Sequence, residues 1–210
     1  MRAWPARADV VDILAIVGLV AVTAVIMAGF AWRYRAPAGR TTGRVAWVFS
    51  TPGRARTLLF LVFTALTATV TWIGWVSLPL PGLSSAVDTS LRLVGTVVYL
   101  AGVVLIVWGR TALGRVWTVA TGLGVRLHED HRLIQHGPFT LVRHPMYVGF
   151  WLLLVGALLI YRTWILVVYL VIALASFSRR AHVEEKALAE AFGKEWRDYA
   201  NRVGRWFPHR

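Results

Sequence analysis

The sequence predicts an all-α integral membrane protein with five transmembrane helices, of which the last two form a helical hairpin. Hydrophobic residues make up 57% of its 210 residues, and the mean hydropathy is +0.59, well above that of soluble proteins. Uncharged stretches that approach the roughly 20 residues of a spanning helix recur along the chain. No linker or internal repeat divides the sequence. We therefore expect a single membrane domain over residues 1–210, with the first three transmembrane helices in 1–112.

Four apolar blocks supply the five expected helices. Val10–Trp32 carries one charge, and Thr57–Leu80 carries none. Leu93–Gly109 is also uncharged. The fourth block, Met146–Ser178, would extend about 50 Å as one helix, which is too long for a single crossing. Because Tyr161-Arg162-Thr163 is a polar break inside it, we expect two short helices joined by a tight turn.

Three glycines mark one face of the third apolar block. Gly95, Gly102 and Gly109 are spaced by seven residues. Small residues at such a spacing allow two helices in a membrane to approach closely. The pattern predicts close packing, either within the chain or between two subunits.

The basic residues predict the orientation in the membrane. Nineteen of the 23 Lys and Arg residues lie in residues 33–56, 110–146 and 177–210. The positive-inside rule places these segments in the cytosol and the N-terminus outside. An odd number of crossings fits this arrangement. Residues 110–146 and the C-terminal tail would then lie on the same side, where they can meet.

Composition excludes several kinds of chemistry. Cysteine is absent, so disulfides, thiolate zinc sites and cysteine nucleophiles are excluded. The net charge of +13 raises the question of nucleic-acid binding. Because the charges fall between apolar blocks, they are explained by membrane topology, and we expect no nucleic-acid partner. We also infer no obligate protein partner.

Two possible ligand motifs do not match their known patterns. Gly122 and Gly124 resemble the start of the G-x-G-x-x-G dinucleotide fingerprint. Leu127 occupies the position of the third glycine, however, and the sequence predicts no βαβ unit around it. Four histidines suggest a metal site, yet their spacing matches no zinc signature, so we expect no metal. These histidines are His128, His131, His136 and His144.

A proline sets the start of the fourth apolar block as a helix N-terminus. Pro145 suits the first helical position, where its missing N–H has no cost. Arg143 and His144 then lie beside free backbone N–H groups and the positive end of the helix dipole. This arrangement suits a carboxylate or phosphate. Without a ligand, the same residues would be an interfacial arginine and a capping histidine.

The C-terminal tail predicts an amphipathic helix with two carboxylates on its apolar side. Glu185 falls within the apolar face and Glu184 on its edge, at 100° per residue. Carboxylates in this position need partners, which Arg143, Arg180 or a ligand could supply. The apolar face consists of Leu188, Phe192, Trp196, Tyr199 and Val203.

The segment from Leu113 to Pro208 resembles the isoprenylcysteine carboxyl methyltransferase family, within the wider group that includes phospholipid N-methyltransferases. No single motif is specific, but their combined order and spacing are. The matching residues are Asp130-His131-Arg132-Leu133-Ile134, Gly137-Pro138-Phe139, Arg143-His144-Pro145-Met146-Tyr147, Arg180, Glu184-Glu185, Leu188, Phe192-Gly193, Trp196, Tyr199 and Pro208.

The resemblance implies an integral membrane enzyme that uses S-adenosylmethionine without a Rossmann domain. Residues 113–208 would form the catalytic region, with a cytosolic cofactor pocket between the loop before the hairpin and the helix after it. Arg180 would hold a carboxylate acceptor, whereas Glu185 would be the base for an amine or thiol acceptor. By analogy, the cofactor pocket is lined by His131, Leu133, Gly137, Phe139, Arg143, His144, Tyr147, Glu184 and Glu185.

Several alternatives stay open at this point. The acceptor is expected to be lipophilic or amphiphilic and to enter from the lipid bilayer. A prenylcysteine-type carboxylate, an isoprenoid acid, a lipid amine and a small thiol are all compatible with the residues. A membrane sterol-type reductase that uses NADPH has a similar architecture. A scaffold that keeps only the fold is a third class.

Overall fold

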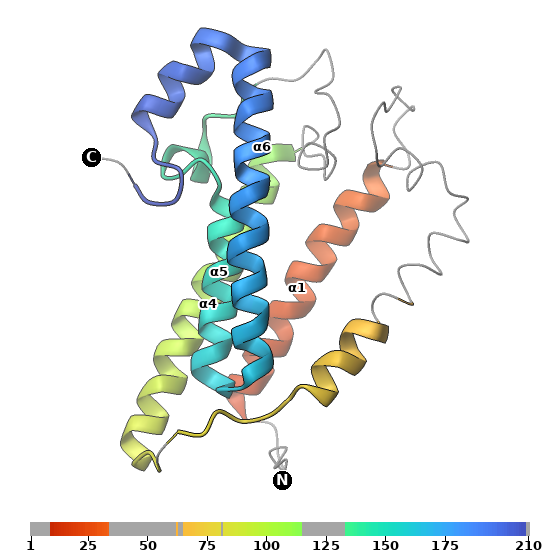
Figure 1. The fold of residues 1–210 in the computed structure, drawn as a ribbon, viewed down its shortest axis with the longest axis vertical. Coiled ribbons are helices and arrows are strands. Elements are labelled where there is room, and N and C mark those ends of the chain that lie inside the picture. The colour runs from red at the N-terminus through yellow and green to blue at the C-terminus, as the bar shows by residue number, and fades with distance from the viewer. Residues whose placement is uncertain (1–8, 34–61, 63–64, 81, 115–132, 209–210) are drawn as a thin grey trace.

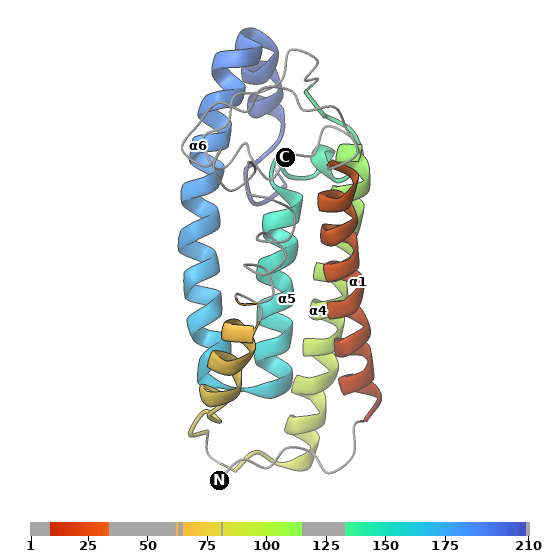
Figure 2. The ribbon, with the colours of Figure 1, turned by 90° about the vertical axis from the view of Figure 1, so that its right-hand side faces the viewer.

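The regular elements of the part of the chain that the structure describes are all helices. The computed structural model describes residues 9–33, 62, 65–80, 82–114 and 133–208, with the backbone alone for 26–33. The all-α prediction is confirmed. The helices are α1 (Val10–Arg33), α4 (Ser85–Leu113), the 3₁₀ helix η3 (Gly137–Thr140), α5 (Pro145–Tyr161) and α6 (Trp164–Arg202). Figures 1 and 2 show α4, α5 and α6 running along the long axis, and Figure 1 shows α1 inclined to them.

The long helices have the length and surface expected of a membrane protein. Both α4 and α6 are long and apolar enough to cross a bilayer, and α5 is a shorter apolar helix. Large apolar side chains are exposed along the helices, among them Ile16, Val97 and Val171. Such a continuous apolar surface is unusual for a soluble protein and suits contact with lipid. The number of crossings and their direction stay predictions.

The hairpin turn lies where the sequence predicts it. Helix α5 ends at Tyr161, Arg162 adopts the left-handed conformation with φ 48°, and α6 begins at Trp164. The Arg162 N–H still donates to the Leu158 carbonyl at 2.9 Å, but the left-handed backbone of Arg162 turns the chain out of the helical path, so α5 ends there. The polar break therefore reverses the chain.

The second helix of the hairpin differs from the prediction. The sequence suggests two short helices and a separate amphipathic tail helix, but α6 continues without a break from Trp164 to Phe192. Nothing in residues 179–192 stops a helix, because charged residues there have high helix propensity. The direction changes only at Gly193, whose φ of 51° is outside the helical range. Figure 1 shows the last part of α6 turning away from the long axis there.

The second apolar block is also not one continuous helix to Leu80. Residues 65–73 are helical, but residues 74–80 are extended or turned. Pro79 lacks the N–H that a helix interior requires. The extended segment instead pairs with the hairpin turn: Leu78 N–H donates to the Arg162 carbonyl at 2.8 Å, and Trp164 N–H donates to Val76 at 2.9 Å.

Helices α4 and α5 pack closely through facing glycines. A Cβ at Gly102 would lie 2.6 Å from the Gly149 carbonyl oxygen, and one at Gly95 would lie 2.9 Å from that of Gly156. A Cβ at Gly109 would meet Met146 at 2.8 Å. All three glycines of the seven-residue pattern thus pack within the chain. They set the position of α5, which carries part of the candidate site.

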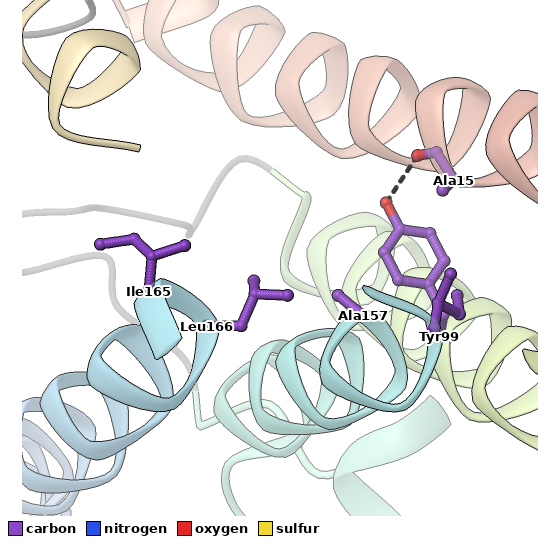
Figure 3. Close-up of a cluster of buried hydrophobic side chains, with 6 residues drawn as sticks. Ala15, Tyr99, Ala157, Ile165 and Leu166 are labelled. Carbon is purple, nitrogen blue, oxygen red and sulfur yellow. Dashed lines mark hydrogen bonds between the residues drawn. The ribbon is translucent and has the colours of Figure 1, made fainter. Parts of the chain in front are cut away.

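A buried apolar cluster joins all four long helices at the end that contains the hairpin turn. Figure 3 shows Ala15 of α1, Tyr99 of α4, Ala157 of α5, and Ile165 and Leu166 of α6. The hydroxyl of Tyr99 donates to the carbonyl of Ala15 at 2.8 Å. This bond satisfies a phenol that would otherwise be unpaired in an apolar core.

Charged residues hold the helices together at the same end of the molecule. Arg92 on α4 pairs with Asp9 at 2.6 Å, and the buried Asp12 accepts from the Tyr161 hydroxyl at 3.2 Å. Arg162 pairs with Asp88 near the start of α4. The charge that interrupts the first apolar block therefore links α1 to α4 and α5.

We predict that Gly102→Ala destabilises the protein by about 1–3 kcal/mol, because the added methyl overlaps the backbone of α5. Thermal unfolding in detergent measures the change. Gly82→Ala is the matched control, since a Cβ there meets nothing within 4 Å. Equal unfolding temperatures for the two variants would contradict the packing argument.

Candidate functional site

Three parts of the chain meet at the opposite end of the molecule from the hairpin turn. They are the N-terminus of α5, residues 180–185 of α6, and the C-terminal segment after α6. Figure 1 shows this segment turning back toward the chain that precedes α5. The backbone N–H of Arg143 donates to the Gly204 carbonyl at 2.9 Å, which holds the C-terminal segment against the N-terminus of α5.

Glu185 is the centre of the polar cluster. Its side chain is 10% exposed, and its carboxylate accepts from Arg143 Nε at 3.0 Å and from His144 Nε2 at 3.0 Å, both at Oε1. Arg205 donates through Nε to both oxygens, at 3.0 and 3.1 Å, and through Nη2 to Oε2. Three side chains from two separate segments therefore hold one buried carboxylate.

Arg143 connects the α5 N-terminus to the end of α6. Its Nη1 donates to the carbonyls of Ala200 at 2.7 Å and Val203 at 2.8 Å. Its guanidinium also lies 5.8 Å from the centre of the Trp196 ring. Three of the five guanidinium N–H groups are thus used within the protein, counting the bond to Glu185. This arginine orders the last turn of α6 as well as the cluster.

Glu184 is the centre of a second, more open group. It accepts from the Tyr147 hydroxyl at 2.7 Å and from Arg180 Nε at 3.4 Å. Its other oxygen is 3.7 Å from His144 Nδ1. The ring of His144 therefore lies between the two carboxylates, with one nitrogen toward each.

Aromatic rings line the side of the cluster nearer the apolar part of the molecule. Tyr147 stacks on His144 at 5.4 Å between ring centres and on Phe177 of α6 at 4.8 Å. Trp206 lies 5.3 Å from His144 and 4.5 Å from Trp151. The indole N–H of Trp151 is buried and has no hydrogen-bond partner within the described ranges. Polar and aromatic groups thus lie together where α5 and α6 meet.

The partners of Glu185 control its ionisation. Burial alone would raise the pKa of this carboxyl, but hydrogen bonds from His144, Arg205 and Arg143 outweigh burial and lower the pKa to about 2. The same interaction with Glu185 raises the pKa of Arg205. Glu185 is therefore a carboxylate at every physiological pH.

The structure brings together six of the residues that the sequence singles out. Their side chains form one connected network, in which His144 joins the group around Glu185 to the group around Glu184. They are Arg143, His144, Tyr147, Arg180, Glu184 and Glu185.

The other proposed pocket residues lie next to this cluster or outside the described ranges. Leu133 packs on the cluster of Trp196, Tyr199 and Val203. Phe139 is buried, and its carbonyl accepts from the Tyr199 hydroxyl at 2.8 Å. Gly137 begins η3 with a φ of 64°. His131 and His128 fall outside the described residues, so the expected absence of a metal stays a prediction.

Sequence reasoning missed the contribution of Arg205, Trp206 and Phe177. Arg205 and Trp206 follow the end of α6, where no helical periodicity assigns them to a face. Phe177 is one of many apolar residues in the fourth block. Its position one turn before Arg180 was the available signal, because aromatic rings at that level reach the same site.

Comparison with known proteins gives the family. The phospholipid methyltransferase family model matches residues 91–195, which is half of the chain. The chain belongs to the phospholipid methyltransferase family. The matched region contains η3, α5, both glutamates and Arg180, and it ends before Arg205.

Curated relatives of this family member are protein-S-isoprenylcysteine O-methyltransferases. The protein from Saccharomyces cerevisiae is 39% identical over 81 residues, which are 38% of this chain and 34% of the yeast protein. A probable protein-S-isoprenylcysteine O-methyltransferase from Oryza sativa subsp. indica is 32% identical over 118 residues, 55% of this chain and 60% of the rice protein. The chain therefore spans between about a third and three fifths of the length of these relatives.

We predict that the stability contributed by Glu185 depends on pH. Its pKa is about 2 in the folded protein against 4.5 ordinarily, so the unfolded chain binds the proton more readily. The contribution is complete above about pH 4.5 and is lost as the pH falls toward 2. The difference in unfolding free energy between wild type and Glu185→Gln should therefore shrink in that window.

Unfolding of both proteins in detergent at pH 6 and pH 3 measures this difference. Glu190→Gln, an exposed position on α6, is the matched control and should follow the wild type at both pH values. A constant difference between wild type and Glu185→Gln across the window would contradict the assignment.

Proposed function

We propose that this protein is an integral membrane methyltransferase that transfers a methyl group from S-adenosylmethionine to a lipophilic or amphiphilic acceptor. The observation that carries the proposal is the contact of Glu185 with Arg143 and His144, which joins the two motifs of the family resemblance in one buried cluster. Family membership supports the chemistry. The names of the relatives support a prenylcysteine-type carboxylate as the acceptor.

The chemistry of the cluster fits the proposed cofactor. Carboxylates such as Glu184 and Glu185 suit hydroxyl or ammonium groups, and the arginines suit a carboxylate. The stacked rings of His144, Tyr147 and Phe177 suit a sulfonium or an adenine ring. When bound, S-adenosylmethionine would supply an electrophilic methyl group on sulfur. The remaining proposed contacts are His131, Leu133, Gly137 and Phe139.

Arg143 and Glu185 also hold this site in shape. Both are buried and bonded within the protein, so they keep the N-terminus of α5 against α6. Preorganised groups of this kind do not need to reorient when a ligand binds. Orientation and exclusion of water then contribute a large part of the rate of a displacement reaction.

The ionisation of Glu185 favours a carboxylate acceptor over an amine or thiol. A general base works best when its pKa is near the working pH, and a pKa of about 2 is far below it. A carboxylate acceptor has no proton to lose and needs only a cation to hold it. We assign that role to Arg180, which is 26% exposed beside Glu184. The family match also favours methyl transfer over the sterol-type reductase.

The same proposal gives the arrangement in the membrane. The positive-inside rule puts the cluster on the cytosolic side, with the C-terminus in the cytosol and the N-terminus outside. The aromatic residues below the cluster lie toward the apolar part of α5 and α6. An amphiphile in the bilayer could then present its polar end to Arg180 while its chain stays in lipid.

We predict that the wild-type protein in detergent binds S-adenosylhomocysteine, and that Glu184→Gln weakens this binding by about tenfold through loss of a charge-assisted bond. Isothermal titration measures the affinity. Glu190→Gln on the same helix is exposed and should bind as the wild type does. A folded wild-type protein that binds neither S-adenosylmethionine nor its demethylated product would refute the proposed function.

A second measurement tests the acceptor. Membrane lipid extracts incubated with the protein and S-adenosylmethionine carrying a labelled methyl group should yield a labelled ester, detected by mass spectrometry and lost on mild alkaline hydrolysis. Label in an alkali-stable lipid amine or thioether would contradict the carboxylate assignment while leaving the methyltransferase proposal intact.

A further inference from the structure

Arg205 contacts the candidate site from outside the region that the family model matches. It lies three residues after α6 ends at Arg202, whereas the family match ends at residue 195. Its guanidinium nevertheless donates to both oxygens of Glu185. Because this contact involves both carboxylate oxygens, it can affect how Glu185 is oriented in the site.

The two oxygens of Glu185 have different surroundings. Oε1 accepts from Arg143 Nε, His144 Nε2 and Arg205 Nε. Within the described part of the chain, Oε2 accepts from Arg205 alone. Arg143 and His144 thus fix one oxygen from α5, and the orientation of the carboxylate about that oxygen depends on Arg205. Two-point contact from a planar guanidinium defines the plane of a carboxylate, which a single point charge cannot do.

The segment that carries Arg205 is anchored on both sides. Before it, the carbonyls of Val203 and Gly204 accept from Arg143. After it, Trp206 packs on His144 and Trp151. The position of Arg205 is therefore set by the same residues that form the cluster. This differs from a surface ion pair, whose flexible partners contribute little.

We propose that Arg205 is a positioning residue of the cofactor site, which orients the Glu185 carboxylate for contact with the hydroxyl or ammonium groups of the bound ligand. This inference rests on the proposed function. Arg205 does not itself touch the reacting atoms. It acts on Glu185 together with Arg143 and His144 from the start of α5. The other ring nitrogen of His144 faces Glu184, which pairs with Arg180 on α6.

Titration with S-adenosylhomocysteine in detergent tests the role of Arg205. Arg205→Ala should weaken binding by about tenfold, because Glu185 loses a two-point partner. Arg205→Lys keeps the charge but not the planar contact, so its affinity should lie between those of Arg205→Ala and the wild type. Arg202→Ala is the matched control, since Arg202 bonds to the Asp198 carbonyl and Gln135, away from Glu185. It should bind as the wild type does.

The pH dependence of binding separates positioning from general loss of structure. Arg205 is one of the groups that lower the pKa of Glu185, so its removal should raise that pKa toward 4.5. The affinity of Arg205→Ala should then fall at a higher pH than that of the wild type when binding is measured from pH 7 down to pH 3. A protein that is merely loosened would show weaker binding with the same pH dependence.

The outcomes are distinct. Binding by Arg205→Ala that equals or exceeds the wild type would overturn the inference and leave the proposed function standing. So would an unchanged pH dependence. If Arg205→Ala does not fold, Arg205→Lys decides, and wild-type affinity in that variant overturns the inference. Absence of binding by the folded wild type would refute the proposed function and this inference together.

Discussion

The buried carboxylate of Glu185 joins three segments: the N-terminus of α5, the middle of α6 and the C-terminal segment. Taking a charge out of water is expensive, and burial is the largest influence on this group. Three donors offset that cost, and each comes with a part of the backbone that must be in place. The N-terminus of α5 brings Arg143 and His144, and the segment after α6 brings Arg205. The ionised state of one residue therefore requires that three segments be folded against one another.

The position of α5 relative to the rest of the molecule follows from a different constraint. Facing glycines bring the backbones of α4 and α5 into close contact, which sets the distance between the two helices. At one end, Tyr161 and Arg162 connect α5 to charged residues on α1 and α4. At the other end, the polar cluster connects it to α6. In the part of the chain that the structure describes, the ion pairs lie toward the two ends of the molecule, and the middle is largely apolar, which suits a bilayer.

The sequence predicted the elements well where a pattern had one physical cause. Apolar length identified α1 and α5, and the polar break identified the turn at Arg162. Glu185 was placed among apolar residues by helical phase, and the structure shows it buried. The predictions failed where two causes competed. The boundary between membrane helix and tail was expected at the loss of hydrophobicity near Ser178, but helix propensity carried α6 on to Gly193. The end of the second block was expected to be helical, but pairing with the hairpin turn and Pro79 decided otherwise.

Arg205 shows why a site of this kind cannot be read completely from motifs. A motif assigns a role to residues whose spacing places them on a known element, and Arg205 lies beyond the last helix. For Arg143 the motif is misleading in another way. It suggests that the side chain binds a ligand, but most of its N–H groups donate to other residues of the protein. Among the described residues, Nε and Nη1 of Arg143 have hydrogen-bond partners and Nη2 has none, so only Nη2 could donate to a ligand. Arg180 is the more exposed of the two side chains, at 26% against 13% for Arg143, and it is the cation that we propose for an anionic ligand. One arginine thus holds the fold, because Glu185 needs the deeper cation as its partner, and the other is the one that we propose faces the ligand.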